Sequence, residues 1–288
     1  MTAHTPHLRV APRWVATAWT LVAATATATA APGSPSPTAA ATGASATAAS
    51  APASASDTRR SGREDMSAQT RAMQDDDRQN PGLLWLQTGQ ALWRQRGGAT
   101  VRSCADCHGE PERMRGVAPR YPAWDHTTGG PLTLGERIAQ CRTRHQQGSP
   151  WATESDERLG LETLVAHASR GLPIAPDPDP RLALAAERGR ARYEQRLGQL
   201  ALSCTECHDQ QAGQRLGGSV IPQGHPTGYP LYRLEWQALG SLQRRMRACL
   251  TGVRAEPWPD GAMEWTELEL HLKRRAAGMP LETPAVRP

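Results

Sequence analysis

The sequence predicts an all-α fold made of two tandem domains. Three observations support this prediction: a long internal repeat, helix-start signals at matching places, and the lack of any convincing strand-like alternation of apolar and polar residues. The chain has 288 residues and a net charge of +5. This length allows two small domains, and no nucleic-acid-binding motif accompanies the positive charge, so no nucleic-acid partner is expected.

The repeat is centred on two copies of the string Cys-x-x-Cys-His. "SCADCH" at 103–108 and "SCTECH" at 203–208 stand in the same register. The match continues upstream at the same spacing. The paired positions are Gly89 with Gly189, Ala91 with Ala191, Trp93 with Tyr193, Gln95 with Gln195, Arg96 with Arg196 and Gly98 with Gly198. A match over this many aligned positions indicates a duplicated domain.

Each half is expected to open with a helix that runs toward its Cys-x-x-Cys-His string. These helices are predicted over about 81–96 and about 180–196. Asn80 and Asp179 precede them as N-cap residues, and each is followed by a proline, which suits the first position of a helix.

A second group of helices follows the loops after these strings. A capping box at Thr133-x-x-Glu136 predicts the start of a helix that carries Cys141. The remaining helices are expected over about 156–170, 234–250 and 263–277. Cys249 lies in the second of these ranges, so each half has one further cysteine on a corresponding helix.

The N-terminal part of the chain is not expected to belong to either domain. Residues 1–31 resemble a signal peptide, because basic residues precede a short apolar run and small residues follow it. An uncleaved anchor is the alternative. Residues 32–79 are predicted to be a disordered tether, rich in Ala, Ser, Thr and Pro and then in charged residues. The two domains are placed at 80–174 and 175–288, and export predicts a periplasmic location without stable membrane insertion.

The Cys-x-x-Cys-His string is typical of covalent haem c attachment. Two thioether bonds need two thiols at a fixed separation, and the next histidine is then held as an axial ligand of the iron. The predicted attachment and ligand residues are Cys104, Cys107 and His108 in the first half and Cys204, Cys207 and His208 in the second. The alternatives are a redox disulfide or half of a zinc site. We therefore expect two class I cytochrome c-like domains that carry two covalently bound haem c groups.

The sixth iron ligand has two kinds of candidate. Methionine is a common ligand in electron carriers, and the sequence offers Met246, Met263 and Met279; Met114 is too close to its string. Cys141 and Cys249 are favoured, because each lies in the corresponding helix of its half. An arginine four positions before each cysteine is expected to lower the thiol pKa. A Cys141–Cys249 disulfide is the alternative.

Arginines are concentrated around Cys249. The segment "RRMRACLTGVRAEPW" at 244–258 contains Arg244, Arg245, Arg247 and Arg254. Guanidinium groups bind anionic oxygens through paired hydrogen bonds. The second half is therefore predicted to be a reaction centre for an anion and the first half an electron relay; a solvated helix face is the alternative.

Together these motifs resemble the SoxA family, the dihaem cytochrome c subunits of SoxAX, an L-cysteine S-thiosulfotransferase. The resemblance covers about 73–282. It is carried by "MQDDDRQNPGLLW" (73–85), both haem strings, "RIAQCRTRHQQGSPW" (137–151), "SRGLPI" (169–174), the Cys249 segment and "KRRAAGMP" (273–280).

The resemblance implies an enzyme of periplasmic thiosulfate oxidation. Such an enzyme joins thiosulfate oxidatively to a cysteine of the SoxYZ carrier, and electrons leave through the haems to an acceptor cytochrome c. It implies a SoxX-type monohaem cytochrome c as a heterodimer partner. Cys249 would be the catalytic cysteine, carrying a persulfide and ligating the second iron, and Cys141 would ligate the first iron. Arg245 and Arg275 (or Arg274) would be active-site arginines.

Two other functions stay open from the sequence. A dihaem c-type electron carrier without substrate chemistry would share both haem strings but would not depend on Cys249. A haem peroxidase is a weaker candidate, and it would need an open position at the iron.

Overall fold

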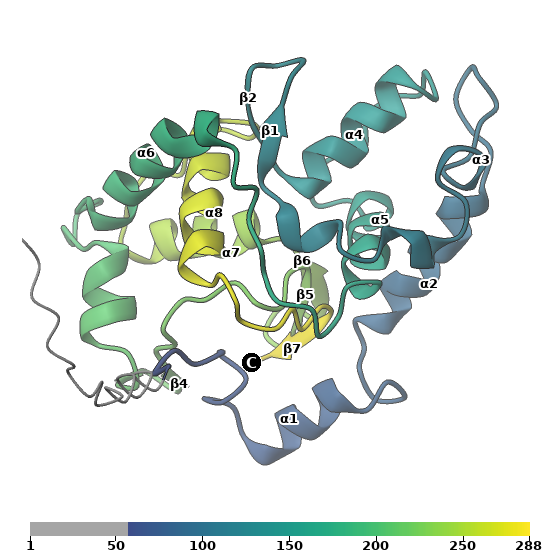
Figure 1. Cartoon of the computed structure of the whole chain (residues 1–288). Helices are drawn as coiled ribbons and strands as arrows, with labels where there is room; N and C mark the ends of the chain where they lie inside the picture. The colour runs from purple at the N-terminus through teal and green to yellow at the C-terminus, as the bar shows by residue number, and fades with distance from the viewer. Residues whose placement is uncertain (1–56) are drawn as a thin grey trace, which may run out of the picture. The chain divides into compact units, whose positions relative to one another are not determined.

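The computed structural model describes residues 57–288, so the predicted signal peptide and residues 32–56 of the tether lie outside the described residues. Figure 1 shows the helices and the short strands, with β5, β6 and β7 near the centre of the view. The α-helices are α1 (Ala68–Asp75), α2 (Leu83–Arg94), α3 (Ala105–His108), α4 (Leu134–Arg144), α5 (Asp156–His167), α6 (Ala183–Glu194), α7 (Leu242–Gly252) and α8 (Met263–Arg275). Single turns are η1 (Pro111–Met114), η2 (Ala118–Arg120), η3 (Pro180–Leu182) and the π-helical η4 (Glu206–Gln210).

The repeat predicted from the sequence is present in the backbone. In the first half α2 crosses α5, and in the second half α6 crosses α8. Both crossings depend on a glycine, because a Cβ on Gly89 would overlap the carbonyl oxygen of Gly160, and one on Gly189 would overlap that of Glu267. The close approach of two backbones at these points explains why the repeat keeps glycine there.

The predicted capping box is confirmed. The Thr133 hydroxyl accepts a hydrogen bond from the backbone N–H of Glu136, and the Glu136 carboxylate accepts one from the backbone N–H of Thr133. In the second half Ser241 caps α7 through its hydroxyl. These two caps fix where the cysteine-bearing helices α4 and α7 begin.

The prediction of an all-α fold is confirmed in part, because residues 57–288 are mainly helical but also contain small sheets. β1 (Ala123–Asp125) pairs with β2 (Gly130–Leu132), and β3 (Arg215–Leu216) pairs with β4 (Ser219–Val220). The third sheet has the order β6-β5-β7. Its strands are β5 (Leu231–Arg233), β6 (Ala238–Gly240) and β7 (Ala285–Arg287), with β7 parallel to β5. Strands of two or three residues are too short to show alternation in a sequence.

One helix boundary was also misplaced. The predicted helix over 234–250 begins only at Leu242, because the preceding residues form the β5–β6 hairpin. Ser241 provides the N-cap signal that marks the true start.

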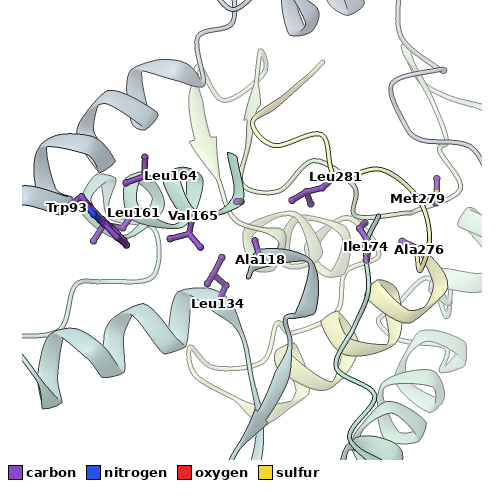
Figure 2. Packing of buried hydrophobic residues seen from close by; sticks show 11 residues of the cluster. Trp93, Ala118, Leu134, Leu161, Leu164, Val165, Ile174, Ala276, Met279 and Leu281 are labelled. Carbon is purple, nitrogen blue, oxygen red and sulfur yellow. The ribbon is translucent and has the colours of Figure 1, made fainter. Parts of the chain in front are cut away.

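The hydrophobic core joins the two halves. Figure 2 shows Trp93, Leu161 and Leu164 of the first half in one cluster with Ala276, Met279 and Leu281 of the second half. The chain around Ile174 runs beside 278–281, with backbone hydrogen bonds in both directions. Ser56–Pro288 therefore form one compact unit. The division into two tandem domains at residue 175 stays a prediction.

The expectation that residues 57–79 are part of a disordered tether is wrong. Ser67 caps α1, and Gln74 at the end of this helix accepts a hydrogen bond from the backbone N–H of Val286 in β7. Asn80 donates to the carbonyl oxygen of Pro284. The polar composition misled the prediction, because this arm is held by hydrogen bonds to the C-terminal strand rather than by a core of its own. None of the helices within 57–288 is long and apolar enough to cross a membrane.

Candidate functional site

His208 and Cys249 face each other at the centre of the second half. Nδ1 of His208 donates a 2.7 Å hydrogen bond to the carbonyl oxygen of Pro222, which leaves Nε2 free for a metal. The Cys249 thiol comes from α7 and is hydrogen-bonded to His208. Histidine and thiolate are both established ligands of haem iron, so His208 and Cys249 are residues that could hold the iron of a haem group.

A cavity of about 570 Å³ opens around this pair. Its apolar walls come from α6, α7 and α8. The apolar residues are Tyr193, Met246, Leu250, Leu268 and Leu272. Cys204 also lines the cavity. A thiol for a thioether bond, apolar walls and two opposed ligands are what haem c requires, so the residues present fit this group.

The two thiols of this cavity have opposite pKa shifts. Burial raises the pKa of Cys204 to about 12, and the neighbouring Cys249 adds to the shift. Burial alone would also raise the pKa of Cys249. The hydrogen bond from His208 and the charges of Arg245, His208 and Arg233 outweigh this effect and lower it. The pKa of Cys249 is therefore shifted in the direction that the sequence predicted, which favours the thiolate.

The arginines around Cys249 point in different directions. Arg244 stacks on the Trp236 ring at 4.2 Å, and Arg247 pairs with Asp260. Arg245 lines the cavity, and no ion pair of its guanidinium is found among residues 57–288. The sequence suggested that four arginines crowd the thiol, but only Arg245 of that segment lines its cavity.

The structure does not bring Arg275 to Cys249. Its guanidinium pairs with Asp209 at 2.5 Å and stacks on the Tyr193 ring at 4.5 Å. It lines a separate pocket on the Asp209 side of His208. Arg274, the alternative, is exposed. Arg275 therefore holds η4, the turn that contains His208, through its ion pair with Asp209. It does not line the cavity in which a substrate could contact the Cys249 thiol.

The first Cys-x-x-Cys-His string lies in a more open setting. Cys107 and His108 are exposed. The His108 ring lies 5.8 Å from the buried Trp93 ring. Burial raises the pKa of Cys104 to about 11, and the negative charge of the Cys141 thiolate adds to this shift. Cys141 on α4 therefore lies near Cys104. The predicted association of Cys141 with the first string is thus present.

The expected lowering of the Cys141 pKa is wrong. Burial raises the pKa of this thiol, and the charge of Arg137 does not compensate. Arg137 donates a 2.9 Å hydrogen bond to Asp125, whose side chain is 3% exposed. Burial raises the pKa of Asp125, but hydrogen bonds from Gln140, Thr128 and Arg137 outweigh it and hold the pKa well below its usual range. The Arg137 charge is therefore neutralised locally.

The alternative ligands occupy different places. Met279 packs in the shared core and Met114 lies against it, whereas Met263 is exposed. Met246 lines the cavity one turn before Cys249. All six cysteines are free, and Cys141 and Cys249 each lie at their own string rather than together.

Sequence reasoning missed two features of the cavity. Arg233, the last residue of β5, lines it beside Arg245. The N-terminal arm also contributes, through Asp65, Met66 and Thr70. The first feature had a sequence signal, because the repeat extends to "YP" at 121–122 and 229–230. The second had none, because the arm has no counterpart in the repeat.

The comparisons with known proteins agree with this geometry. The family model "SoxA/TsdA, cytochrome c domain" matches residues 88–174, and a cytochrome c domain implies haem c. The chain is 32% identical to the L-cysteine S-thiosulfotransferase subunit SoxA of Rhodovulum sulfidophilum over 229 residues, covering 79% of this chain and 80% of the relative. It is 32% identical to the SoxA subunit of Pseudaminobacter salicylatoxidans over 222 residues, covering 76% and 78%. The crystal structure of SoxXA from P. pantotrophus superposes with a TM-score of 0.77 and 30% identity, covering 80% of this chain and 87% of that one.

Proposed function

Because the chain belongs to the SoxA family of L-cysteine S-thiosulfotransferase subunits, we propose that it is a haem-dependent sulfur transferase of periplasmic sulfur oxidation. It couples thiosulfate oxidatively to a cysteine of the SoxYZ carrier. The observation that carries this proposal is the cavity that holds the Cys249 thiol and His208 together with Arg245, which has no ion-pair partner within residues 57–288. A plain electron carrier has no use for a cationic group beside an activated thiol.

Two sets of residues would hold two haem c groups. Cys104, Cys107 and His108 would hold the first with Cys141 as the further ligand. The second set is Cys204, Cys207, His208 and Cys249. Bound haem c would supply an acceptor for the electrons that the coupling releases.

The chain's own residues account for the sulfur chemistry. In the proposed cycle Cys249 carries a persulfide. Its outer sulfur forms an S–S bond with the sulfane sulfur of thiosulfate, and two electrons are released. The thiolate of the carrier cysteine then attacks that sulfane sulfur, takes the thiosulfate group and leaves the Cys249 persulfide as before. Arg245 holds the sulfonate oxygens during both steps.

The partners follow from the same assignment. A SoxX-type monohaem cytochrome c is proposed as the heterodimer partner, since the similar crystal structure is of SoxXA. An acceptor cytochrome c would receive the electrons. The open setting of the first string suits an electron relay between the second site and these partners. Signal-peptide export to the periplasm completes the proposal.

Reconstitution tests this function. The holoprotein, matured with haem, is combined with a SoxX-type cytochrome, SoxYZ and thiosulfate, and reduction of an acceptor cytochrome is followed. Turnover that requires all components and is lost in Cys249→Ser is expected. Equal turnover in Cys249→Ser, with both haems in place, would favour a dihaem electron carrier.

A further inference from the structure

The hairpin that precedes each cysteine-bearing helix is built in the same way in both halves. β1 and β2 form a hairpin before α4, and β5 and β6 form one before α7. The number of residues between Cys141 and Cys249 is the same as that between β1 and β5, between β2 and β6, and between the starts of α4 and α7. Positions in the two units therefore correspond one to one, and Arg137 corresponds to Arg245.

The last residue of the first hairpin strand has opposite charge in the two halves. It is Asp125 in β1 and Arg233 in β5. Asp125 accepts hydrogen bonds from Arg137 at 2.9 Å and from Gln140 at 3.1 Å. The counterpart of Gln140 is Ala248. The second half thus lacks both the buried carboxylate of Asp125 and the amide donor of Gln140. Arg233 and Arg245 occupy the positions that form the Asp125–Arg137 ion pair in the first half.

Arg233 is held in the wall of the cavity. Its side chain is 12% exposed, and its guanidinium lies 5.2 Å from the Trp236 ring. One terminal nitrogen pairs with the exposed Glu235 at 2.6 Å, while Nε is buried and has no hydrogen-bond partner within residues 57–288. Burial lowers the pKa of Arg233, and the charge of Arg245 lowers it further. The two guanidiniums are therefore near enough to repel each other.

We infer that Arg233 and Arg245 together form the anion-binding site beside Cys249, and that Arg233 is a substrate-binding residue. Two like charges at the wall of a mainly apolar cavity are unfavourable alone and become favourable when a divalent anion lies between them. Their planar groups suit the oxygens of a sulfonate. The identity of the anion as thiosulfate rests on the proposed function.

This site replaces the arginine pair suggested by sequence resemblance. Both Arg275 and Arg233 have a carboxylate partner, but only Arg233 lines the cavity of the Cys249 thiol, whereas Arg275 lines the separate pocket beside Asp209. In the first half, Arg137 forms an ion pair with Asp125, so its guanidinium is not available to bind another anion. The opposite charges at this one position separate a relay site from a substrate site.

Two variants and one control test the inference in the holoprotein. Arg233→Ala removes one guanidinium. Arg233→Asp recreates the pair of the first half and so provides a variant that keeps a partner for Arg245. Arg247→Ala is the control, because it removes the same charge from α7 but from a side chain paired with Asp260. For each, the rise in Tm caused by thiosulfate is measured without turnover, and the KM for thiosulfate is measured in the reconstituted system.

Thiosulfate should raise the Tm of the wild type and of Arg247→Ala, since it binds the folded state. This rise should vanish in both Arg233 variants, and their KM should increase about ten-fold or more with a smaller change in kcat. Unchanged Tm response and KM in Arg233→Ala and Arg233→Asp would overturn the inference while leaving the proposed transferase intact. The wild type could also show a thiosulfate-dependent rise in Tm that is lost in the Arg233 variants, but no turnover in the reconstituted system. That result would support the anion site and reject the proposed transferase.

Discussion

The two Cys-x-x-Cys-His sites share a scaffold and differ in how the cysteine opposite each histidine is surrounded. Both cysteines lie on a helix that follows a hairpin and a hydroxyl N-cap. Burial raises the pKa of Cys141, whereas the hydrogen bond to His208 and nearby arginines lower that of Cys249. The difference teaches that two similar scaffolds can surround a cysteine with different charges, and under the proposed function these few charged side chains distinguish the substrate site from the relay.

The largest expected difference between the sites concerns the cysteines themselves. Cys249→Ser should reduce thiosulfate-dependent turnover by about 1,000-fold, because it removes the group that carries the sulfur. Cys141→Ser should reduce it by less than about ten-fold, because in the proposed function Cys141 is a ligand of the electron relay and carries no sulfur. Turnover is measured by acceptor reduction, with haem content determined for each variant. Equal losses in the two variants would remove the distinction between reaction centre and relay.

The corresponding arginines should separate activity from stability. Arg245→Ala should lower kcat/KM by about 10–100-fold with little change in Tm, because its charge serves an anion. Arg137→Ala should leave kcat/KM nearly unchanged but lower the free energy of unfolding by about 2–3 kcal/mol, because Asp125 is then buried without its cation. Kinetics and thermal unfolding of both variants check this. A loss of stability in Arg245→Ala together with a loss of kcat/KM in Arg137→Ala would contradict the comparison.

The shared scaffold should respond alike in both halves. Gly89→Ala and Gly189→Ala both place a methyl group against the backbone of the crossing helix. Each should destabilise the fold by about 2–4 kcal/mol, as overpacking does at tight contacts. Thermal unfolding measures the loss. A substitution to alanine at exposed Gly218 provides the control, because a Cβ there would meet open space and its backbone is outside the left-handed region. A large loss in only one half would mean that the two crossings are not equivalent.

The smallest expected effect comes from a carboxyl group between the halves. Burial raises the pKa of Glu162 from 4.5 to about 7. The groups that influence it are Arg158, Glu154, Lys273 and Glu136. Glu162 and Glu269 line one small pocket, which is separate from the cavity around Cys249. Burial also raises the pKa of Glu269. Because the folded protein holds this proton more tightly than the unfolded chain, Glu162 stabilises the fold below about pH 4.5, and this contribution is lost as pH rises through 7.

Glu162→Gln should therefore make stability less dependent on pH. The Tm of the variant should exceed that of the wild type by about 5 °C at pH 8 and by much less at pH 5. Thermal unfolding at several pH values checks the direction. A variant that is less stable than the wild type at pH 8 would show that the Glu162 carboxylate is stabilised as a charge, first by Arg158 and then by Lys273.

Much of the scaffold could be predicted from the sequence, because helix signals and covalent motifs are local. The capping box at Thr133 and the helix that leads to each Cys-x-x-Cys-His string follow from a few adjacent or repeated residues. The close helix crossing at Gly89 became visible only in the structure. The position of Cys249 opposite His208 was also predictable from the repeat. The start of α7 was missed because three-residue strands carry no periodic pattern.

The substrate site was harder to predict than the haem sites. Arg275 was chosen from family resemblance, but its position next to Asp209 depends on how α8 packs beside the loop after His208. Arg233 follows the haem string by a loop longer than that of the first half, so its equivalence to Asp125 becomes visible only when the hairpins are compared. The repeated Tyr-Pro at 121–122 and 229–230 is the one sequence signal for the equivalence of Asp125 and Arg233, whereas the packing that places Arg275 leaves no local signal.

The central claim is that sulfur chemistry takes place at Cys249 and not at Cys141. The most direct measurement is peptide mass analysis of the holoprotein, matured with haem and exposed to thiosulfate and SoxYZ. The account predicts two haem-bearing peptides, added sulfur on the Cys249 peptide and an unmodified Cys141 peptide. Added sulfur on Cys141, or a bare Cys249 in a protein that turns over, would contradict it.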